Sequence, residues 1–323
     1  MTAWPDPWAR EWTDVDKVRA ELDAGADPLG DLGYYGKALH VAAERGSPEV
    51  VAELARRAAD VDAEVHGRTA LWVAVCHRRP DMARVLVEAG ADPWRPMMGG
   101  WSPGRLSLAG PTPDLFDVPA DEPGLTEDEA VLVSIAPRLN ELFAPGADEG
   151  AGLACVTGID ADEAVRRLDG VLLDARQVDT AEDDMDDDMD IVGVTDVPGG
   201  CVVVQPWGYA PQMTGVVGRL SAGTVAYGMY ANPKSGGQGI LAEEGVIVGS
   251  DLSPGGPDFG VTSRDVLAAY LTPDRPVAHC FVHTGLTPAD ARAIEGPPDV
   301  WIRLPARDWW EWSAWGDGRR WPA

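Results

Sequence analysis

An internal repeat with a period of 32 residues constrains the fold of this chain more than any other feature of its sequence. The stretch KALHVAAERGSPEVVAELARRAADVDAE (37–64) aligns with TALWVAVCHRRPDMARVLVEAGADPW (69–94). A half-copy, DVDKVRAELDAGADP (14–28), precedes them, and GGWSPGRLSLAG (99–110) resembles a degenerate fourth copy. Self-similarity at a fixed period of this length indicates a stack of repeated supersecondary units.

The pattern resembles the ankyrin repeat, in which a T-P-L-H-x-A-A first helix precedes a G-h-x-E-V-V second helix and a G-A-D-h-N turn. The resemblance covers about residues 10–110 and implies an N-terminal α-solenoid of antiparallel helix pairs that bury their apolar stripes by stacking. Two positions depart from the pattern: the Thr before Ala38 is missing, and Arg78 replaces a loop Gly. A left-handed residue other than Gly costs about 1 kcal/mol. Because the array is short, we expect it to lean on the rest of the chain.

The resemblance also implies recognition of another protein through side chains at the finger tips and at the ends of the inner helices. Tyr and Arg are enriched at interface hot spots, which suits this role. The alternative is that these side chains pack against the second domain or face water. The carried-over positions are Tyr34, Tyr35, Lys37, Val65, His66 and Arg68 in the fingers, and Glu44, Arg45, Cys76 and His77 on the inner helices.

Length and charge bound the remaining possibilities. A chain of 323 residues predicts about two domains, and neither a membrane span nor a secretory signal is evident, so a cytoplasmic protein is expected. The net charge is −27, of which −23 falls in residues 111–323. This negative charge would repel phosphate backbones, so we do not expect direct nucleic-acid binding. The charge favours either simple solubility or a basic partner. The four cysteines are far apart, which is typical of buried, reduced thiols.

The C-terminal part is expected to form an acidic α+β domain. Prolines crowd the linker at 111–125, after which Thr126 and Glu129 have the spacing of a capping box. Strand and helix patterns then alternate through 126–323, giving the overall prediction of an α+β multidomain chain with the solenoid at 1–110. Segments between 150 and 300 are similar to an actinobacterial domain of unknown function, a resemblance that carries no activity.

The clearest candidate for chemistry in that domain is AHCFVH (278–283). His279 and His283 share one face of either a helix or a strand, and Cys280 lies beside them as a conceivable nucleophile. No known Cys/His protease motif surrounds them, so a core strand is the favoured interpretation of the segment. The pattern TPADARAIEG (287–296) predicts a further helix, capped by Thr287 with Pro288 at its first position.

Two other segments invite sharper interpretations that their geometry does not support. The acidic run between Asp179 and Asp190 lacks the Gly and the spaced Glu of a calcium loop, which favours a solvated loop. In NPKSGGQG (232–239) the Lys precedes the glycines, so the segment is a turn and not a phosphate loop. We therefore expect no metal site and no cofactor.

Tryptophan gathers near both chain ends. Trp4, Trp8 and Trp12 recur every four residues, and six more tryptophans lie between Trp301 and Trp321. Burial of such large side chains favours termini that dock back onto the fold, as an N-terminal cap and a C-terminal tail. The alternative is an exposed aromatic patch that binds a partner or a planar ligand.

The sequence thus favours a cytoplasmic adaptor or regulatory protein that binds a protein partner through the ankyrin-like surface. One alternative is an inhibitor or immunity-type protein whose acidic domain blocks a basic partner. The other is an enzyme or small-ligand-binding domain at 150–323 that the repeats direct to its target; on balance we do not expect an enzyme.

Overall fold

The chain divides into two compact units by its internal contacts. Unit 1 comprises residues 1–130 and 261–270, and unit 2 comprises residues 131–260 and 271–323. The computed structural model describes residues 4–143, 150–174, 177–178, 190–232, 234, 236–251, 253–255 and 262–316. The domain limits at 110 and 125 stay a prediction, while the short segment 262–270 groups with the repeats.

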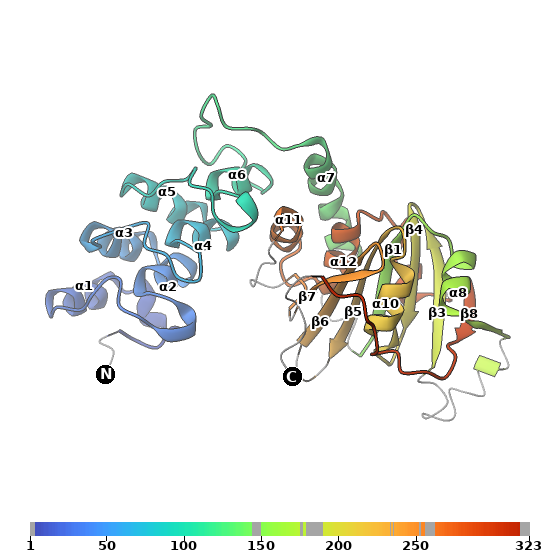
Figure 1. Ribbon diagram of the computed structural model, residues 1–323. Helices are drawn as coiled ribbons and strands as arrows, with labels where there is room; N and C mark the ends of the chain where they lie inside the picture. The colour runs from blue at the N-terminus through green and yellow to red at the C-terminus, as the bar shows by residue number, and fades with distance from the viewer. Residues whose placement is uncertain are drawn as a thin grey trace. The chain divides into compact units, whose positions relative to one another are not determined.

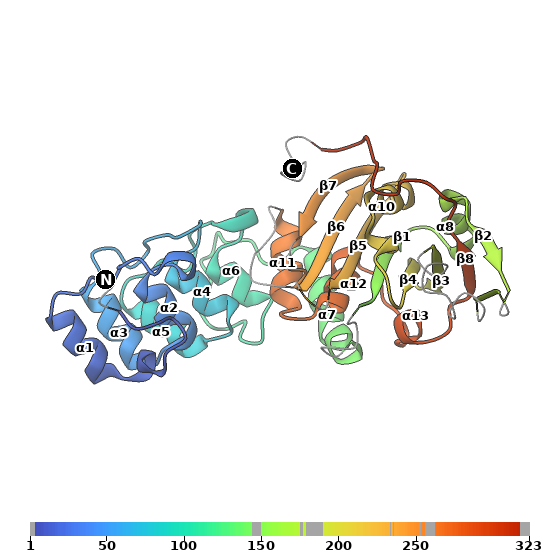
Figure 2. The same ribbon diagram turned by 90° about the horizontal axis from the view of Figure 1, so that it is seen from below.

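Unit 1 is built from paired helices arranged in two rows (Figures 1 and 2). The first row packs α1 on α3 and α3 on α5, and the second packs α2 on α4 and α4 on α6. The apolar positions that match across the sequence repeat fill the interior, where each matched leucine is fully buried. The helices are α1 (Val15–Asp23), α2 (Ala38–Arg45), α3 (Pro48–Arg57), α4 (Ala70–Cys76), α5 (Pro80–Glu88) and α6 (Pro103–Leu108), with 3-10 turns η1 (Arg10–Thr13), η2 (Gly33–Tyr35) and η3 (Met98–Gly100).

Both departures from the repeat pattern have visible structural consequences. The Thr69 hydroxyl accepts a hydrogen bond from the Trp72 backbone N–H at 3.1 Å and so caps α4, whereas Lys37 at the start of α2 provides no side-chain cap. Arg78 takes the loop position with φ +54°, the left-handed conformation expected there. The corresponding residue of the preceding copy, Gly46, has φ −79°, so the two copies differ at this loop in backbone as well as in helix capping.

The fingers between the repeats are short β-bridges. Val65 and Arg68 exchange backbone hydrogen bonds of 2.9 and 3.0 Å around His66 and Gly67, whose φ angles are +50° and +70°. Positive φ at both central residues is the geometry of a two-residue hairpin turn, which Gly adopts without strain. The preceding finger is closed by a bridge between Asp31 and Lys37.

A distant helix completes the last repeat. The indole Nε1 of Trp101, at the start of α6, donates to the Ser263 carbonyl across 162 positions of sequence, and Arg78 Nη2 donates to the Tyr270 carbonyl at 3.3 Å. Both acceptors lie on α11 (Ser263–Leu271), whose residues Val266 to Tyr270 are buried. The repeat stack therefore draws its final helix from a segment far along the chain.

Unit 2 contains an antiparallel sheet of eight strands in the order β2-β8-β3-β4-β1-β5-β6-β7. Every described pair of neighbours is antiparallel. With the repeats of unit 1, this sheet gives the α+β, multidomain architecture expected from the sequence. The strands are β1 (Gly152–Thr157), β2 (Val171–Leu173), β3 (Ile191–Val197), β4 (Gly200–Gln205), β5 (Val225–Asn232), β6 (Gly236–Glu243), β7 (Val246–Asp251) and β8 (Val300–Arg303).

Helices cover both faces of this sheet (Figure 2). On one face, α8 (Ala161–Leu168) and α10 (Thr214–Leu220) pack on a core of small and β-branched residues that includes Ala154, Val156 and Val203. On the other face lie α12 (Pro276–Thr284), over β1 and β5, and α13 (Arg292–Glu295), over β3 and β4. Alternate strand residues supply the two cores, as the period of two requires.

Two secondary-structure predictions in this region are wrong. The segment containing His279 is helix α12 and not a core strand, because Pro276 occupies its first turn and Gly285 ends it with φ +78°. The helix expected from Thr287 is reduced to Arg292–Glu295. There the Arg138 guanidinium (from α7, Glu127–Leu142) donates to the Pro288 and Ala289 carbonyls and holds the preceding residues in a non-helical path.

The C-terminal tail protects one edge of the sheet. Ile247 of β7 donates to the Ala314 carbonyl at 3.0 Å and accepts from Gly316 at 2.9 Å, while Trp309 is buried. At the other terminus Trp4 and Trp12 are buried and stack on each other. Most of these described tryptophans thus pack onto the fold, with Trp8 and Trp310 as exposed exceptions; Trp321 lies outside the described residues.

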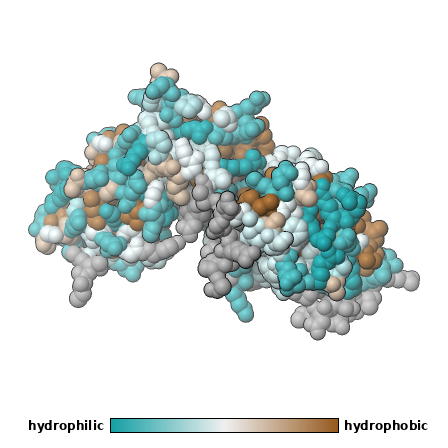
Figure 3. Space-filling view, in the orientation of Figure 1, coloured by the Kyte–Doolittle hydropathy of each residue, from teal (hydrophilic) through white to brown (hydrophobic). Residues whose placement is uncertain are grey.

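The surface seen in Figure 3 is largely hydrophilic, with small apolar patches on each unit. None of the helices in the described part of the chain has the length and apolar character that spanning a bilayer demands.

Candidate protein-binding surface

Trp8, Tyr35 and Arg45 form one contact cluster on unit 1, which we call the Trp8 cluster. The Trp8 indole Nε1 donates to the Tyr35 hydroxyl at 3.0 Å, and the two rings meet edge to face. The Arg45 guanidinium carbon lies 3.5 Å from the centroid of the Trp8 ring, a cation–π contact. Trp8 is 64% exposed and Tyr35 is 39% exposed, so both rings face solvent.

Local structure fixes each member of the Trp8 cluster. Tyr35 lies in η2, within the first finger, and Arg45 is the last residue of α2. Trp8 is tied to Asp6, because its backbone N–H donates to the Asp6 carboxylate, and Asp6 is itself anchored by the buried Trp12, whose indole donates to the Asp6 carbonyl. Arg45 also pairs with Glu44 at 2.5 Å. The finger and the helix end are thereby joined by the N-terminal segment.

The structure brings together three of the residues expected to bind a partner, namely Tyr35, Glu44 and Arg45. Trp8 is not among the residues expected from the sequence to bind a partner, because its spacing with Trp4 and Trp12 favours a docked cap. The informative signal was the tryptophan period itself: two of the three rings are buried and the third is left outside. The side chain of Tyr34 lies outside the described structure.

Two further cations, Lys37 and Arg68, lie on the fingers near the buried His40. Burial, with smaller contributions from these two cations, lowers the pKa of His40 to about 4. The His40 Nε2 contacts the Arg68 carbonyl at 2.9 Å. His40 is therefore a neutral, buried link between the two fingers, with one positive side chain on each finger.

The remaining predicted positions are distributed along the same fingers and helix end. Val65 is half-buried and His66 is exposed at the second finger tip. Cys76 and His77 occupy the end of α4, where burial raises the pKa of the half-buried Cys76 thiol and keeps it neutral, and where His77 is exposed. These positions correspond along the repeat to Glu44 and Arg45, but no described contact links them to the Trp8 cluster.

In unit 2 the three catalytic suspects separate into two environments. His279 and His283 are buried and flank the Tyr227 ring, with ring centroids 5.4 and 5.0 Å away. The Tyr227 hydroxyl donates to Asp251 at 3.1 Å, and His279 Nε2 lies 3.8 Å from that carboxylate. Such a group is equally typical of a satisfied core, because buried polar atoms require partners.

Cys280 is directed elsewhere. Its thiol donates to the Pro276 carbonyl of the same helix at 3.2 Å, and its side chain is fully buried. The Cys280 thiol is thus engaged by a backbone carbonyl of its own helix. Among the described residues, no group of three or more His, Cys, Asp and Glu side chains is arranged to hold a metal ion.

The two other segments weighed from the sequence are outside any site that the structure describes. The acidic run from Asp179 lies outside the described residues, except for Asp190. The segment NPKSGGQG starts at Asn232, the last residue of β5, and ends within β6, which begins at Gly236; Pro233 and Ser235 lie outside the described residues.

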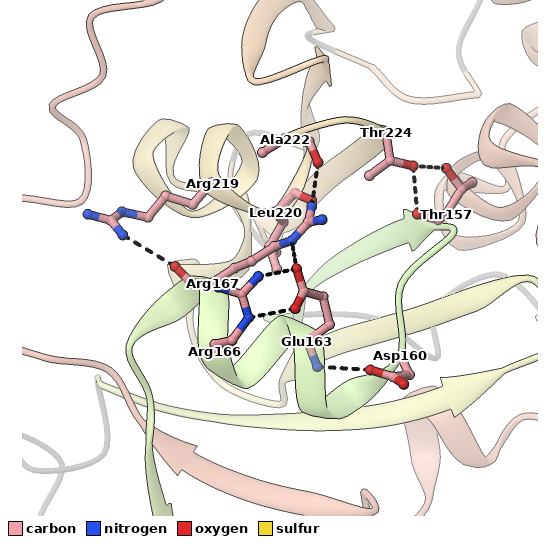
Figure 4. A network of polar contacts seen from close by, with 9 residues as sticks. All are labelled: Thr157, Asp160, Glu163, Arg166, Arg167, Arg219, Leu220, Ala222 and Thr224. Carbon is pink, nitrogen blue, oxygen red and sulfur yellow. Dashed lines mark hydrogen bonds and ion pairs between the residues drawn. The ribbon is translucent and has the colours of Figure 1, made fainter.

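Arginines of unit 2 are committed to internal contacts, as Figure 4 shows around α8. Glu163 accepts hydrogen bonds from Arg166 and Arg167, which lower its pKa to about 2. Arg167 also donates to the Leu220 and Ala222 carbonyls, both at 2.7 Å. These arginines form ion pairs with particular carboxylates and hydrogen bonds with particular carbonyls. The other acidic side chains of the unit are left in excess.

The fold and its exposed Tyr, Trp and Arg side chains define a helical-repeat protein with an appended α+β unit. Comparison with protein families matches residues 13–97 to ankyrin repeats, in three copies, which confirms the resemblance over that range. No curated protein matches the chain. The resemblance of residues 150–300 to a domain of unknown function stays a prediction.

Proposed function

We propose that this chain is an adaptor or regulatory protein that captures a protein partner through the Trp8 cluster. Ankyrin repeats support protein–protein interaction in general. The observation that carries the specific proposal is the Arg45 guanidinium stacked on an exposed Trp8 ring that Tyr35 holds in place. Trp, Tyr and Arg are the residue types that dominate binding energy at interfaces.

The chemistry of this surface suggests what the partner presents to it. Arg45 places a cation on the Trp8 ring, and Lys37 and Arg68 place one cation on each finger near His40, on a protein whose net charge is −27. A partner segment with carboxylates next to an apolar side chain complements that arrangement. The surface thus selects against the basic partner that net charge alone suggests, and such a partner suits unit 2 better.

Two alternatives differ in which unit carries the activity. An inhibitor or immunity-type protein would use the acidic unit to cover a basic active site, and its binding would survive loss of the Trp8 cluster. An enzyme in unit 2 would depend on the buried His279 and His283. Substitution of both histidines without any effect on phenotype would remove the basis for the enzyme.

Site-specific photo-crosslinking tests the proposal. A photoreactive phenylalanine derivative at Tyr35 is expected to capture one protein in stoichiometric amount from cells that make the chain. The same derivative at Arg56, an exposed position on α3 away from the fingers, is the matched control. Equal capture at both positions, or none at Tyr35 in low salt, would contradict the proposal.

A further inference from the structure

A second aromatic cluster lies on unit 2, where the ends of β4 and β5 meet the C-terminal tail. The rings of Tyr209 and Trp310 are stacked with centroids 6.0 Å apart, and Tyr230 meets Tyr209 edge-on at 5.8 Å. Trp310 is 47% exposed, and Trp207, two residues before Tyr209, is 72% exposed. This group, Tyr209, Tyr230 and Trp310, is called the Trp310 cluster below.

Hydrogen bonds fix the backbone of Trp310, although its ring faces solvent. The Thr214 hydroxyl donates to the Trp310 carbonyl at 2.6 Å, and the Trp310 N–H donates to the Asp308 carboxylate at 2.9 Å. The neighbouring Trp309 is buried, with its carbonyl accepting from Gly215 at 2.7 Å. Because Trp309 is buried against α10, the adjacent Trp310 side chain is directed toward solvent. The exposure of this ring therefore follows from the fold.

The charge around the cluster is negative. Asp308 and Glu311 are exposed on either side of the Trp309–Trp310 pair. The nearest tail cation, Arg307, pairs with Asp169 at 3.0 Å and lies over the Trp309 ring, and Arg219 also pairs with Asp169. The cations that flank this stretch of the tail are thus bound to a different carboxylate.

From this combination we infer that the Trp310 cluster binds an arginine- or lysine-bearing peptide segment of a partner protein. The face of an aromatic ring attracts a cation, and nearby carboxylates strengthen that attraction. The residual charge of −23 in residues 111–323 excludes a phosphate-rich ligand by repulsion. The inference is independent of the Trp8 cluster, which lies on unit 1 and carries cations of its own.

Binding of two short peptides to the full chain tests the inference. One peptide carries two arginines separated by a proline, and the other carries citrulline at both positions, which keeps the shape and removes the charge. The arginine peptide is expected to bind and to quench tryptophan fluorescence, whereas the citrulline peptide binds at least about tenfold more weakly. Equal binding of the two peptides would overturn the role of the cation.

Variants separate the cluster from the general acidity of the chain. Trp310→Ala is expected to weaken the arginine peptide about fivefold to tenfold, and Asp308→Asn with Glu311→Gln to weaken it while leaving the tail contacts in place. Leu172→Ala, which removes an exposed apolar side chain from β2 of the same acidic unit, is the matched control and is expected to bind as the unaltered chain does. If Trp310→Ala retains its native circular dichroism and binds the peptide as tightly as Leu172→Ala does, attraction is nonspecific and the inference fails.

Discussion

The guanidinium of Arg45 lies 3.5 Å from the centroid of the Trp8 indole, although the two residues belong to a helix end and to the segment before the first repeat. The contact places a cation over the ring of a tryptophan that is 64% exposed. It also binds the N-terminal segment to the first full repeat. One contact therefore contributes both to the stability of the N-terminal segment and to the proposed binding surface.

Helix capping differs between the two full repeats and gives a paired prediction. Thr69→Ala removes the hydroxyl that accepts from the Trp72 N–H and is expected to lower the free energy of unfolding by about 1 kcal/mol. Lys37→Thr, at the equivalent position, introduces such a cap and is expected to raise it by up to about 1 kcal/mol. Urea denaturation of both variants checks the signs, and two changes of the same sign would contradict the repeat alignment.

Backbone conformation in the second finger predicts a loss of stability from a substitution that alters no side-chain contact. Gly67 has φ +70° with nothing within 4 Å of an added Cβ, so Gly67→Ala is expected to lose about 1 kcal/mol of stability from conformation alone. Gly124→Ala is the matched control, because that position is equally open and its φ lies outside the left-handed range. Thermal unfolding that shifts equally in both variants would show that strain is not the cause.

Burial of His40 makes stability depend on pH. The folded imidazole has a pKa of about 4 against the ordinary value of 6.5, because burial and the nearby Lys37 and Arg68 disfavour its charged form. Below pH 6.5 the unfolded chain takes up a proton that the folded chain does not, so this stabilisation is complete above pH 6.5 and falls as the pH drops towards 4. The loss is on the order of 3 kcal/mol.

The variant His40→Gln separates this effect from the titration of the many carboxylates. It keeps a side chain able to reach the Arg68 carbonyl but cannot titrate. The difference in unfolding free energy between the unaltered chain and His40→Gln is expected to shrink between pH 6.5 and 4. A difference that stays constant over that interval would show that His40 does not titrate as its burial requires.

The distant helix α11 makes the repeats dependent on the C-terminal sequence. Residues 1–130 produced alone lack the Ser263 and Tyr270 carbonyls that accept from Trp101 and Arg78. They also expose the otherwise fully buried Trp101. We expect this fragment to unfold at lower temperature than the repeats of the full chain and to bind a hydrophobic dye. Equal thermal stability would mean that α11 is dispensable.

The periodic parts of this fold were predictable from the sequence. Leucine spacing and the GADP turns gave the repeats, the left-handed Arg78 followed from its loop position, and Thr126 with Glu129 forms the capping box that its spacing predicts. These features depend on local geometry, in which residues a few positions apart determine the outcome.

Long-range pairing was not predictable in the same way. The segment at Pro276 has apolar and β-branched residues that suit a strand or a helix, and packing across β1 and β5 accompanies its helical form. β8 pairs with β3 through a register that no local pattern encodes. In the Trp8 cluster, Tyr35 and Arg45 are 27 and 37 positions from Trp8. The sequence therefore indicated which types of side chain could bind a partner but not that these three are in contact.

Partner capture by the Trp8 cluster is tested most directly by binding affinity for the crosslinked partner. Once crosslinking at position 35 has identified that partner, its affinity is measured by isothermal titration calorimetry for the full chain and for the variants Arg45→Ala and Arg56→Ala. The two variants compare a residue of the Trp8 cluster with an exposed arginine on α3. The account predicts that Arg45→Ala weakens binding at least about tenfold while Arg56→Ala changes it less than about twofold. Equal affinity for all three proteins would contradict it.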